Sequence, residues 1–232
     1  MNVDREQAHF ENRYDAGRQL ADKLGGYKGQ SEVVLAIPNG GVPIGLEVAL
    51  ALEADLDLVI SRKIPLPLNP EAGFGAVADD GTVILNEEVV EKVGLSPHQI
   101  NYQINRVRAE IRRRSLLYRK DRPPSAVNGK TVIITDDGLA SGFTMMVAVE
   151  SVRRRRPKEI VVAVPAASVA ALAQLEKVAD KVVTMVKGTM PKFYIADFYR
   201  NWYDISDGEV TQCLKEWQMR HFRSNTKPPH NK

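Results

Sequence analysis

The feature that most constrains the fold is a repeated alternation of short apolar runs with helix-like segments. Each run has the length and composition of a strand buried on both faces, which is typical of parallel sheets covered by helices. A helical segment between two such runs provides a parallel crossover. We therefore predict an α/β fold with an open, mainly parallel central sheet and flanking helices. The predicted strands are Val33–Ile37, Leu56–Ser61, Thr131–Thr135, Ile160–Val164 and Lys181–Val186, and the predicted helices are Phe10–Leu24, Ile44–Leu52, Pro97–Tyr118, Thr144–Arg155, Ser168–Val178 and Asp207–Trp217.

Two neighbouring segments do not fit this alternation. Ser61–Ala72 contains Pro65, Pro67 and Pro70. Because proline donates no backbone hydrogen bond, we predict an irregular loop there. Val77–Ile84 contains an Asp-Gly pair, which accepts the positive φ angles of a tight turn and predicts a β-hairpin.

Size and composition set broad limits. A chain of 232 residues, 44% of them hydrophobic, can bury one main core. Cys213 is the single cysteine, so it forms no internal disulfide and we expect an inert thiol. Met1–Leu20 mixes charges throughout, and no uncharged apolar run approaches the roughly 20 residues that span a bilayer. We expect a cytoplasmic protein with no membrane partner, and the net charge of +3 does not by itself predict nucleic-acid binding.

The strongest chemical signal follows the predicted strand Thr131–Thr135, where Asp136 and Asp137 stand side by side. In open α/β sheets ligands bind beyond the carboxyl ends of the strands. Two carboxylates repel phosphate, but they suit vicinal sugar hydroxyls and a divalent cation.

A tight turn then leads into a predicted helix. Backbone N–H groups at a helix start bind phosphate, and Gly142 lets the backbone approach the phosphate oxygens. Ser141 and Thr144 add hydroxyl donors. The alternative is an ordinary strand-end turn with Ser141 as a helix cap. The two acids and Ser-Gly-x-Thr in one register favour a ribose 5-phosphate site.

This arrangement resembles the signature of the type I phosphoribosyltransferases, and every fixed position is matched between Val132 and Thr144. The resemblance implies a glycosyltransferase of nucleotide metabolism that binds 5-phosphoribosyl-1-pyrophosphate (PRPP) with Mg²⁺ and transfers phosphoribose to a nitrogen acceptor. It implies Lys63, Asp136 and Asp137 as catalytic residues, with both aspartates at the ribose and the metal. The 5-phosphate residues that it implies are Leu139, Ala140, Ser141, Gly142, Phe143 and Thr144. Phe143 departs from the family pattern, where a small or basic residue is frequent.

A second match follows the first predicted strand. In the family the equivalent loop binds pyrophosphate, often through backbone N–H groups and a strained or cis peptide, which implies this role for Asn39, Gly40 and Gly41. Relatives frequently carry arginine at position 39, so Asn39 removes one cation. Arg62 and Lys63, at the end of the second predicted strand, are the implied pyrophosphate cations. The alternative is a solvated strand end.

The resemblance covers about Phe10 to Glu216. It is closest to a group of phosphoribosyltransferase-domain proteins that carry Arg-Lys followed by Asn-Pro-Glu, here Asn69-Pro70-Glu71, and by a Gly-Ala-Val strand, here Gly75-Ala76-Val77. These features identify relatives and not a substrate.

The family also has a hood over the acceptor base. It implies an N-terminal hood part at residues 1–30, a core at 31–186 and a C-terminal hood at 187–222, and we expect a disordered tail at 223–232. The aromatic-rich hood suggests Phe193, Tyr194 and Asp197 at the base, because flat rings stack on heterocycles. The alternative is that most of these rings pack the hood onto the sheet.

The acceptor class is narrowed by one position. Relatives that use hypoxanthine or guanine place an aspartate immediately before the Ser/Thr-Gly of the phosphate loop, where it serves as general base. Ala140 stands there, and its methyl group exchanges no proton. We therefore expect an acceptor that is not a 6-oxopurine, unless Asp197 or Glu71 replaces the missing base.

A different class of function stays open. Some regulators keep this fold with degraded catalysis and bind nucleic acid through a basic face, and Arg112–Arg114 and Arg153–Arg156 could form one. The simpler explanation of Arg153–Arg156 is that cations favour a helix C-terminus. We favour the enzyme, as a homodimer whose lid is either Pro65–Gly75 or Arg112–Tyr118.

Overall fold

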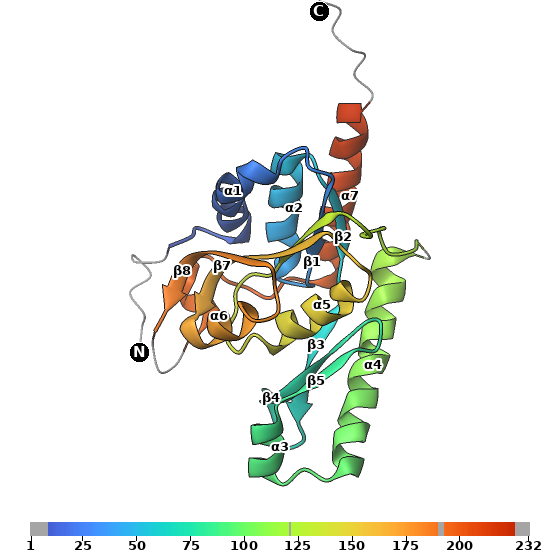
Figure 1. The fold of residues 1–232 in the computed structure, drawn as a ribbon, viewed down its shortest axis with the longest axis vertical. Helices are drawn as coiled ribbons and strands as arrows, with labels where there is room; N and C mark the ends of the chain where they lie inside the picture. Colours follow the sequence, from blue (N-terminus) through green and yellow to red (C-terminus); the bar gives the residue numbers. More distant parts are fainter. Residues whose placement is uncertain (1–8, 121, 190–192, 226–232) are drawn as a thin grey trace, which may run out of the picture.

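A computed structural model describes residues 9–120, 122–189 and 193–225, with side chains to residue 221. Its centre is a five-stranded sheet in the order β2-β1-β6-β7-β8, in which every neighbouring pair is parallel (Figure 1). The strands are β1 (Glu32–Ala36), β2 (Asp55–Leu58), β6 (Thr131–Thr135), β7 (Glu159–Ser168) and β8 (Lys181–Gly188). All residues of β1 and β6 are buried, as expected for central parallel strands. The predicted α/β fold is confirmed.

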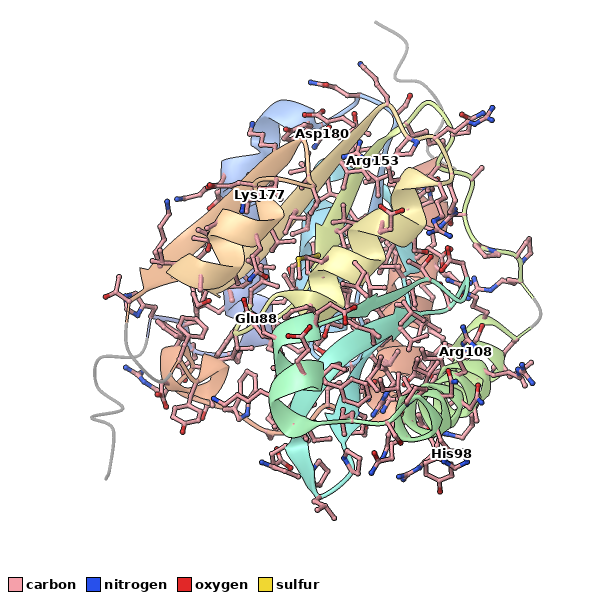
Figure 2. The ribbon with its side chains drawn as sticks, turned by 60° about the horizontal axis from the view of Figure 1, so that its bottom comes forward. Glu88, His98, Arg108, Arg153, Lys177 and Asp180 are labelled. Carbon is pink, nitrogen blue, oxygen red and sulfur yellow. The ribbon has the colours of Figure 1, made fainter. Side chains whose placement is uncertain are left out.

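Helices cover both faces of this sheet and divide the core in two. One core packs α1 (Arg13–Leu24), α2 (Gly41–Leu52) and α7 (Asp207–Asn225) against the sheet. The other packs α5 (Phe143–Arg153) and α6 (Val169–Leu175) against the opposite face, where Figure 2 shows them lying over the strands. Neighbouring residues of β1 and β6 alternate between the two cores, as the period of a strand requires.

A second unit projects from the central sheet (Figure 1). It is an antiparallel sheet of β3 (Ser61–Leu66), β4 (Asn69–Ala78) and β5 (Val83–Leu85), followed by α3 (Glu87–Val93) and the long α4 (Pro97–Arg119). The predicted hairpin within Val77–Ile84 is confirmed by the β4–β5 pairing.

The predicted irregular loop Ser61–Ala72 is wrong, because this segment forms β3 and the start of β4. β3 is an edge strand, where a missing N–H donor can face away from the ladder. The register of β3 against β4 also shifts on both sides of Pro65. Pro65 is therefore accommodated by the edge and the irregularity, Pro67 lies in the turn between the two strands, and Pro70 lies near the start of β4, before the residues that pair with β5.

Element ends follow local capping signals. The side chain of Asn12 caps α1, and Ser96 forms a capping box with Gln99 at the start of α4. α7 is longer than predicted and continues to Asn225, so residues 223–225 of the predicted tail are helical. The remainder of that tail, 226–232, and residues 1–8 of the N-terminal hood part lie outside the described residues. Among the helices that the structure describes, none is long and apolar enough to cross a membrane.

Candidate active site

A cleft of about 1080 Å³ lies where the chain leaves the carboxyl ends of β1 and β6. These strands are neighbours from which the order runs in opposite directions, to β2 and to β7. Such a switch point is the usual ligand site of an open α/β sheet. The cleft brings together seven of the predicted site residues: Asn39, Gly40, Arg62, Lys63, Asp136, Asp137 and Thr144.

The loop after β1 lies directly against the two acids. A Cβ atom added to Gly40 would stand 1.9 Å from Oδ2 of Asp137, and one added to Gly41 would stand 2.7 Å from the carbonyl oxygen of Thr135. The Pro38–Asn39 peptide bond is cis. Glycine is therefore required at both positions, because a side chain there would collide with the residues at the end of β6.

Arg13, which the sequence did not indicate, lies at the acid pair. Its Nε donates to Oδ2 of Asp137 at 2.9 Å, and its Nη1 donates to the carbonyl oxygen of Tyr203 at 2.8 Å. The guanidinium lies 3.8 Å from the ring centroid of Trp202. Only 5% of Arg13 is exposed. An N-terminal helix residue therefore becomes part of the site.

The backbone of Asp137 is also fixed, because the hydroxyl of Tyr199 donates to its carbonyl oxygen at 2.6 Å. Tyr199 belongs to the C-terminal hood, and this hood pairs with the N-terminal segment: the N–H of Phe10 donates to Phe198 and that of Arg200 donates to Phe10. The N-terminal segment and the predicted C-terminal hood thus meet beside Asp137.

Burial disfavours the charged form of both acids. The pKa of Asp136 is raised well above its ordinary value by burial and then by repulsion from Asp137. The pKa of Asp137 is also raised by burial, although Arg13 acts in the opposite direction. Two carboxylates thus share one guanidinium, and the pair favours an added cation or hydroxyl donors.

These residues fit a magnesium ion that also takes substrate oxygens. The structure groups no three His, Cys, Asp or Glu side chains as a metal site among its described residues. Mg²⁺ commonly uses only one or two protein carboxylates and completes its shell with water and substrate phosphates. Asp136 and Asp137 supply that donor set, and their excess negative charge favours a cation.

The predicted phosphate loop is anchored to β7. The N–H of Leu139 donates to Ala166, and its carbonyl oxygen accepts from Ser168. Gly142 has a φ of +80° and caps α5 without a side-chain hydrogen bond to the first turn. The first N–H groups of α5 therefore have no capping side chain and suit an anion.

The side chains of this loop differ in position. Ala140 and Ser141 are exposed, and Thr144 is partly buried and lines the cleft. Phe143 packs against the apolar cluster that includes Ala76 of β4. Its ring thus serves the contact between α5 and the antiparallel sheet, which explains the departure from the family pattern.

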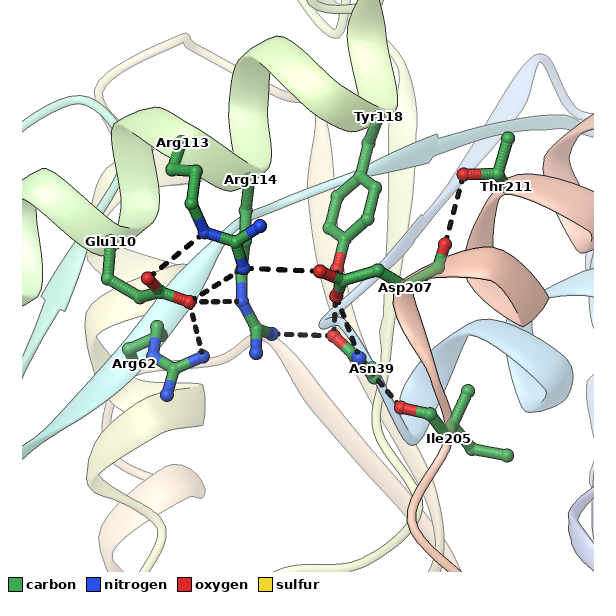
Figure 3. A network of polar contacts seen from close by, with 9 residues as sticks. All are labelled: Asn39, Arg62, Glu110, Arg113, Arg114, Tyr118, Ile205, Asp207 and Thr211. Atoms are coloured by element: carbon green, nitrogen blue, oxygen red, sulfur yellow. Dashed lines mark hydrogen bonds and ion pairs between the residues drawn. The ribbon is translucent and has the colours of Figure 1, made fainter.

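The side chain of Asn39 is held by a polar network (Figure 3). Its Oδ1 accepts from Tyr118 at 3.0 Å and from Arg114 at 2.5 Å, while its Nδ2 donates to the carbonyl oxygen of Ile205 and to Asp207. From the sequence, Asn39 stands where relatives frequently carry an arginine, so one cation is missing at this position. The sequence did not predict that Arg114 of α4 supplies a cation beside Asn39.

The other predicted pyrophosphate residues lie on β3. Arg62 is partly buried, and burial followed by repulsion from Arg114 lowers its pKa. Lys63 is exposed and donates to the carbonyl oxygen of Glu71. Of the two predicted lids, Pro65–Gly75 belongs to the β3–β4 hairpin and Arg112–Tyr118 lies within the continuous helix α4.

The predicted base residues do not line the cleft. Phe193 packs on Gly188 and lies 5.0 Å from the ring of Phe198, while Tyr194 is exposed and Asp197 is partly buried in a short 3₁₀ turn. The residues of the predicted hood that do line it are Trp202, Asp204 and Ile205 in its C-terminal part and Arg13 in its N-terminal part.

Comparisons with known proteins identify a family for this chain. Residues 7–196 match the model of the phosphoribosyl transferase domain. Two Mycobacterium tuberculosis proteins, "Putative phosphoribosyl transferase Rv0571c" of strain H37Rv and "Putative phosphoribosyl transferase MT0597" of strain CDC 1551, are each 36% identical over 205 residues. The match covers 88% of this chain and 46% of theirs, so the chain spans about half the length of these curated relatives.

A solved structure extends the similarity to the fold. The crystal structure of TT1426 from Thermus thermophilus is 33% identical, with a TM-score of 0.74, and the match covers 90% of this chain and 99% of that one. The resemblance first indicated by the motif is confirmed. The chain therefore belongs to the phosphoribosyl transferase domain family.

Proposed function

We propose that this chain binds PRPP together with Mg²⁺ and transfers the phosphoribosyl group to a nitrogen atom of a small acceptor. The observation that carries the proposal is the cleft itself. It joins the acid pair after β6, the loop after β1 and the start of α5 in one space. Each of these three parts suits a different group of PRPP.

The three parts define a binding mode. The N–H groups at the start of α5, with Ser141 and Thr144, hold the 5-phosphate. Asp136 and Asp137 accept hydrogen bonds from the ribose hydroxyls. The pyrophosphate then lies toward the loop after β1 and toward Arg62 and Lys63.

The reaction is a substitution at C1′ of the ribose. The C1′–O bond breaks, pyrophosphate leaves with the electron pair, the acceptor nitrogen forms the C1′–N bond and then loses its proton. When bound by Asp136, Asp137 and substrate oxygens, magnesium supplies positive charge near the leaving group. The side chains mainly position the sugar and screen the charge that develops on pyrophosphate.

For the acceptor we propose a nucleobase that is not a 6-oxopurine. The argument rests on Ala140, which has no proton to exchange where such enzymes use an aspartate. Three carboxylates could replace it: Asp197 and Glu71, as expected from the sequence, and Asp204, which lines the cleft. Turnover of hypoxanthine or guanine that disappears in one of the three Asp→Asn or Glu→Gln variants would contradict the proposal.

The nucleic-acid regulator gains no specific support. Arg113 and Arg114 line the cleft. Arg153 pairs with Asp180 at 2.8 Å (Figure 2), and Arg154 pairs with Glu150. These arginines are thus engaged by neighbouring carboxylates, as the dipole explanation and ordinary ion pairing expect.

The decisive experiment measures PRPP binding and turnover. We expect PRPP to raise the melting temperature more with Mg²⁺ than without it. We then expect pyrophosphate release with at least one base from a nucleobase panel. Absence of both magnesium-dependent stabilisation and turnover would overturn the proposed function. Tight, sequence-selective nucleic-acid binding without turnover would favour the regulator.

A further inference from the structure

Three arginines of the cleft converge on a single carboxylate. Oε1 of Glu110 lies 3.0 Å from Nη2 of Arg113, 3.1 Å from Nε of Arg114 and 3.8 Å from Nη1 of Arg62 (Figure 3). Arg113 also contacts Asp207 at 3.1 Å. Three guanidinium groups therefore face two carboxylates, and the cluster retains an excess of positive charge.

Arg114 is the member of this cluster closest to the loop after β1. Its Nη1 donates to Oδ1 of Asn39, and its side chain is only 15% exposed. Asn39 is neutral, and its amide is bonded to α4 and to the start of α7. The positive charge at this loop therefore comes from α4 and not from position 39.

Glu110 presents to these arginines the kind of oxygen that a phosphate would present. A guanidinium binds carboxylate and phosphate oxygens with the same planar donors. Hydrogen bonds from Arg113 and Arg114 lower the pKa of Glu110 to about 2, so it stays charged at every ordinary pH. Any phosphate that enters here must share its donors with Glu110.

We propose that Arg113 and Arg114 of α4, with Arg62, form the subsite for the pyrophosphate group of the donor, and that Glu110 is a built-in competitor for it. The inference rests on the proposed function and deepens it, because it assigns residues and a form of control to the leaving group. A competing carboxylate weakens the hold on pyrophosphate once the bond to C1′ is broken, which favours product release.

The test is calorimetric titration with inorganic pyrophosphate at fixed ionic strength. Arg114→Gln removes a charge-assisted donor and should weaken binding by about tenfold or more. Arg113→Gln, at a more exposed position, should weaken it by a smaller factor. Glu110→Gln removes the competing charge but keeps the size of the side chain, and should tighten binding by roughly threefold or more.

A matched control is available on the same helix. Arg112 is exposed and does not line the cleft, so Arg112→Gln makes the same charge change and should leave the affinity within about twofold. Circular dichroism and melting curves check that each variant folds. Equal binding by Arg113→Gln and wild type, or weaker binding by a folded Glu110→Gln, would overturn the inference.

The outcome separates this inference from the proposed function. If pyrophosphate binds with the expected order of variants but PRPP shows no turnover with any acceptor, the α4 subsite stands and the transferase assignment fails. If PRPP turns over and both Arg114→Gln and Glu110→Gln bind pyrophosphate as the wild type does, the transferase assignment stands and this subsite is wrong.

Discussion

The two charged regions of the cleft are built in opposite ways. At the end of β6 two buried carboxylates share one guanidinium, that of Arg13. On α4 and β3 three guanidinium groups share Glu110, and Asp207 supplies the second carboxylate. The region at β6 is thus left with an excess of negative charge, and the region at α4 and β3 with an excess of positive charge.

The opposite charges of the two regions let one cleft hold a molecule with unlike parts. Excess negative charge favours hydroxyl groups and a divalent cation, and excess positive charge favours phosphate oxygens. The regions also differ in burial, since Arg13 is 5% exposed, whereas the side chains of Arg114 and Arg113 are 15% and 53% exposed. The buried region should therefore control stability, and the exposed one mainly binding.

The largest expected effect comes from removing the cation of the acidic region. Arg13→Met leaves Asp137 buried without its partner, and breaking such a pair costs about 3–5 kcal/mol of unfolding free energy. Urea denaturation measures the loss. Adding Asp137→Asn to Arg13→Met should restore part of it, because the unpaired charge is then gone. An Arg13→Met variant as stable as the wild type would show that the pair contributes little.

The next prediction concerns Asp136, where one substitution should weaken PRPP binding but increase stability. Asp136→Asn should weaken PRPP binding in the presence of Mg²⁺ by about 1.5–3 kcal/mol, through loss of a charged acceptor. It should also raise the unfolding free energy, because a charge disfavoured by burial is removed. Titration and denaturation measure the two quantities.

A matched control is Asp22→Asn, at an exposed position of α1, which should change neither quantity. If Asp136→Asn lost stability while keeping PRPP affinity, the acid would have a structural role only.

How much of this could be predicted from the sequence depends on how local each signal is. The acids after β6, the turn at Gly142 and the start of α5 lie within one short segment, so their spacing alone was enough to predict the phosphate and ribose parts that we propose. The alternation of apolar runs and helices likewise predicted the parallel sheet, because burial on both faces leaves a continuous apolar run.

The contributions of Arg13 and Arg114 were missed because both come from distant segments. Arg114 stands in a helix whose many basic residues suggested a lid or a nucleic-acid-binding face, and only the fold brings it to Asn39. Arg13 carried one faint signal. It is the first residue of α1, where a cation is disfavoured by the helix dipole, so an arginine there indicates a partner elsewhere.

The β3–β4 hairpin was missed for another reason. A proline argues against a strand only where its position must donate a backbone hydrogen bond to a neighbouring strand. The position of β3 at an edge of the sheet, where one side has no neighbour, cannot be known before the sheet is assembled.

A smaller expected effect tests the contact that joins the loop after β1 to the acids. Gly40→Ala places a methyl group where Oδ2 of Asp137 now stands, and we expect a loss of about 1–3 kcal/mol in unfolding free energy with weaker PRPP binding. Gly25→Ala is the control, because its added Cβ would meet nothing within 4 Å. Equal melting temperatures for the two variants would mean that the loop yields without cost.

The smallest effect is the contrast in pH dependence between the two regions. The folded-state pKa of Asp136 is raised above the ordinary value of 3.8. Above 3.8 the folded protein therefore holds a proton that the unfolded chain has lost, so this residue's contribution to stability is complete below 3.8 and falls as the pH rises toward the raised pKa. One proton changes the unfolding free energy by at most about 1.4 kcal/mol per pH unit.

The contribution of Glu110 to stability changes with pH in the opposite direction. Its pKa of about 2 gives stability that is present above the ordinary glutamate value of 4.5 and is lost only in stronger acid. Between pH 5 and pH 8 the unfolding free energy should thus not change with pH on account of Glu110.

The measurement is denaturation of the wild type and of Asp136→Asn across this range. The other titrating groups largely cancel in the difference between their unfolding free energies, and this difference in favour of the variant should grow with pH. The same comparison with Glu110→Gln should give a constant difference. A constant difference for Asp136→Asn would mean that burial does not raise the pKa of its carboxyl group in the folded protein.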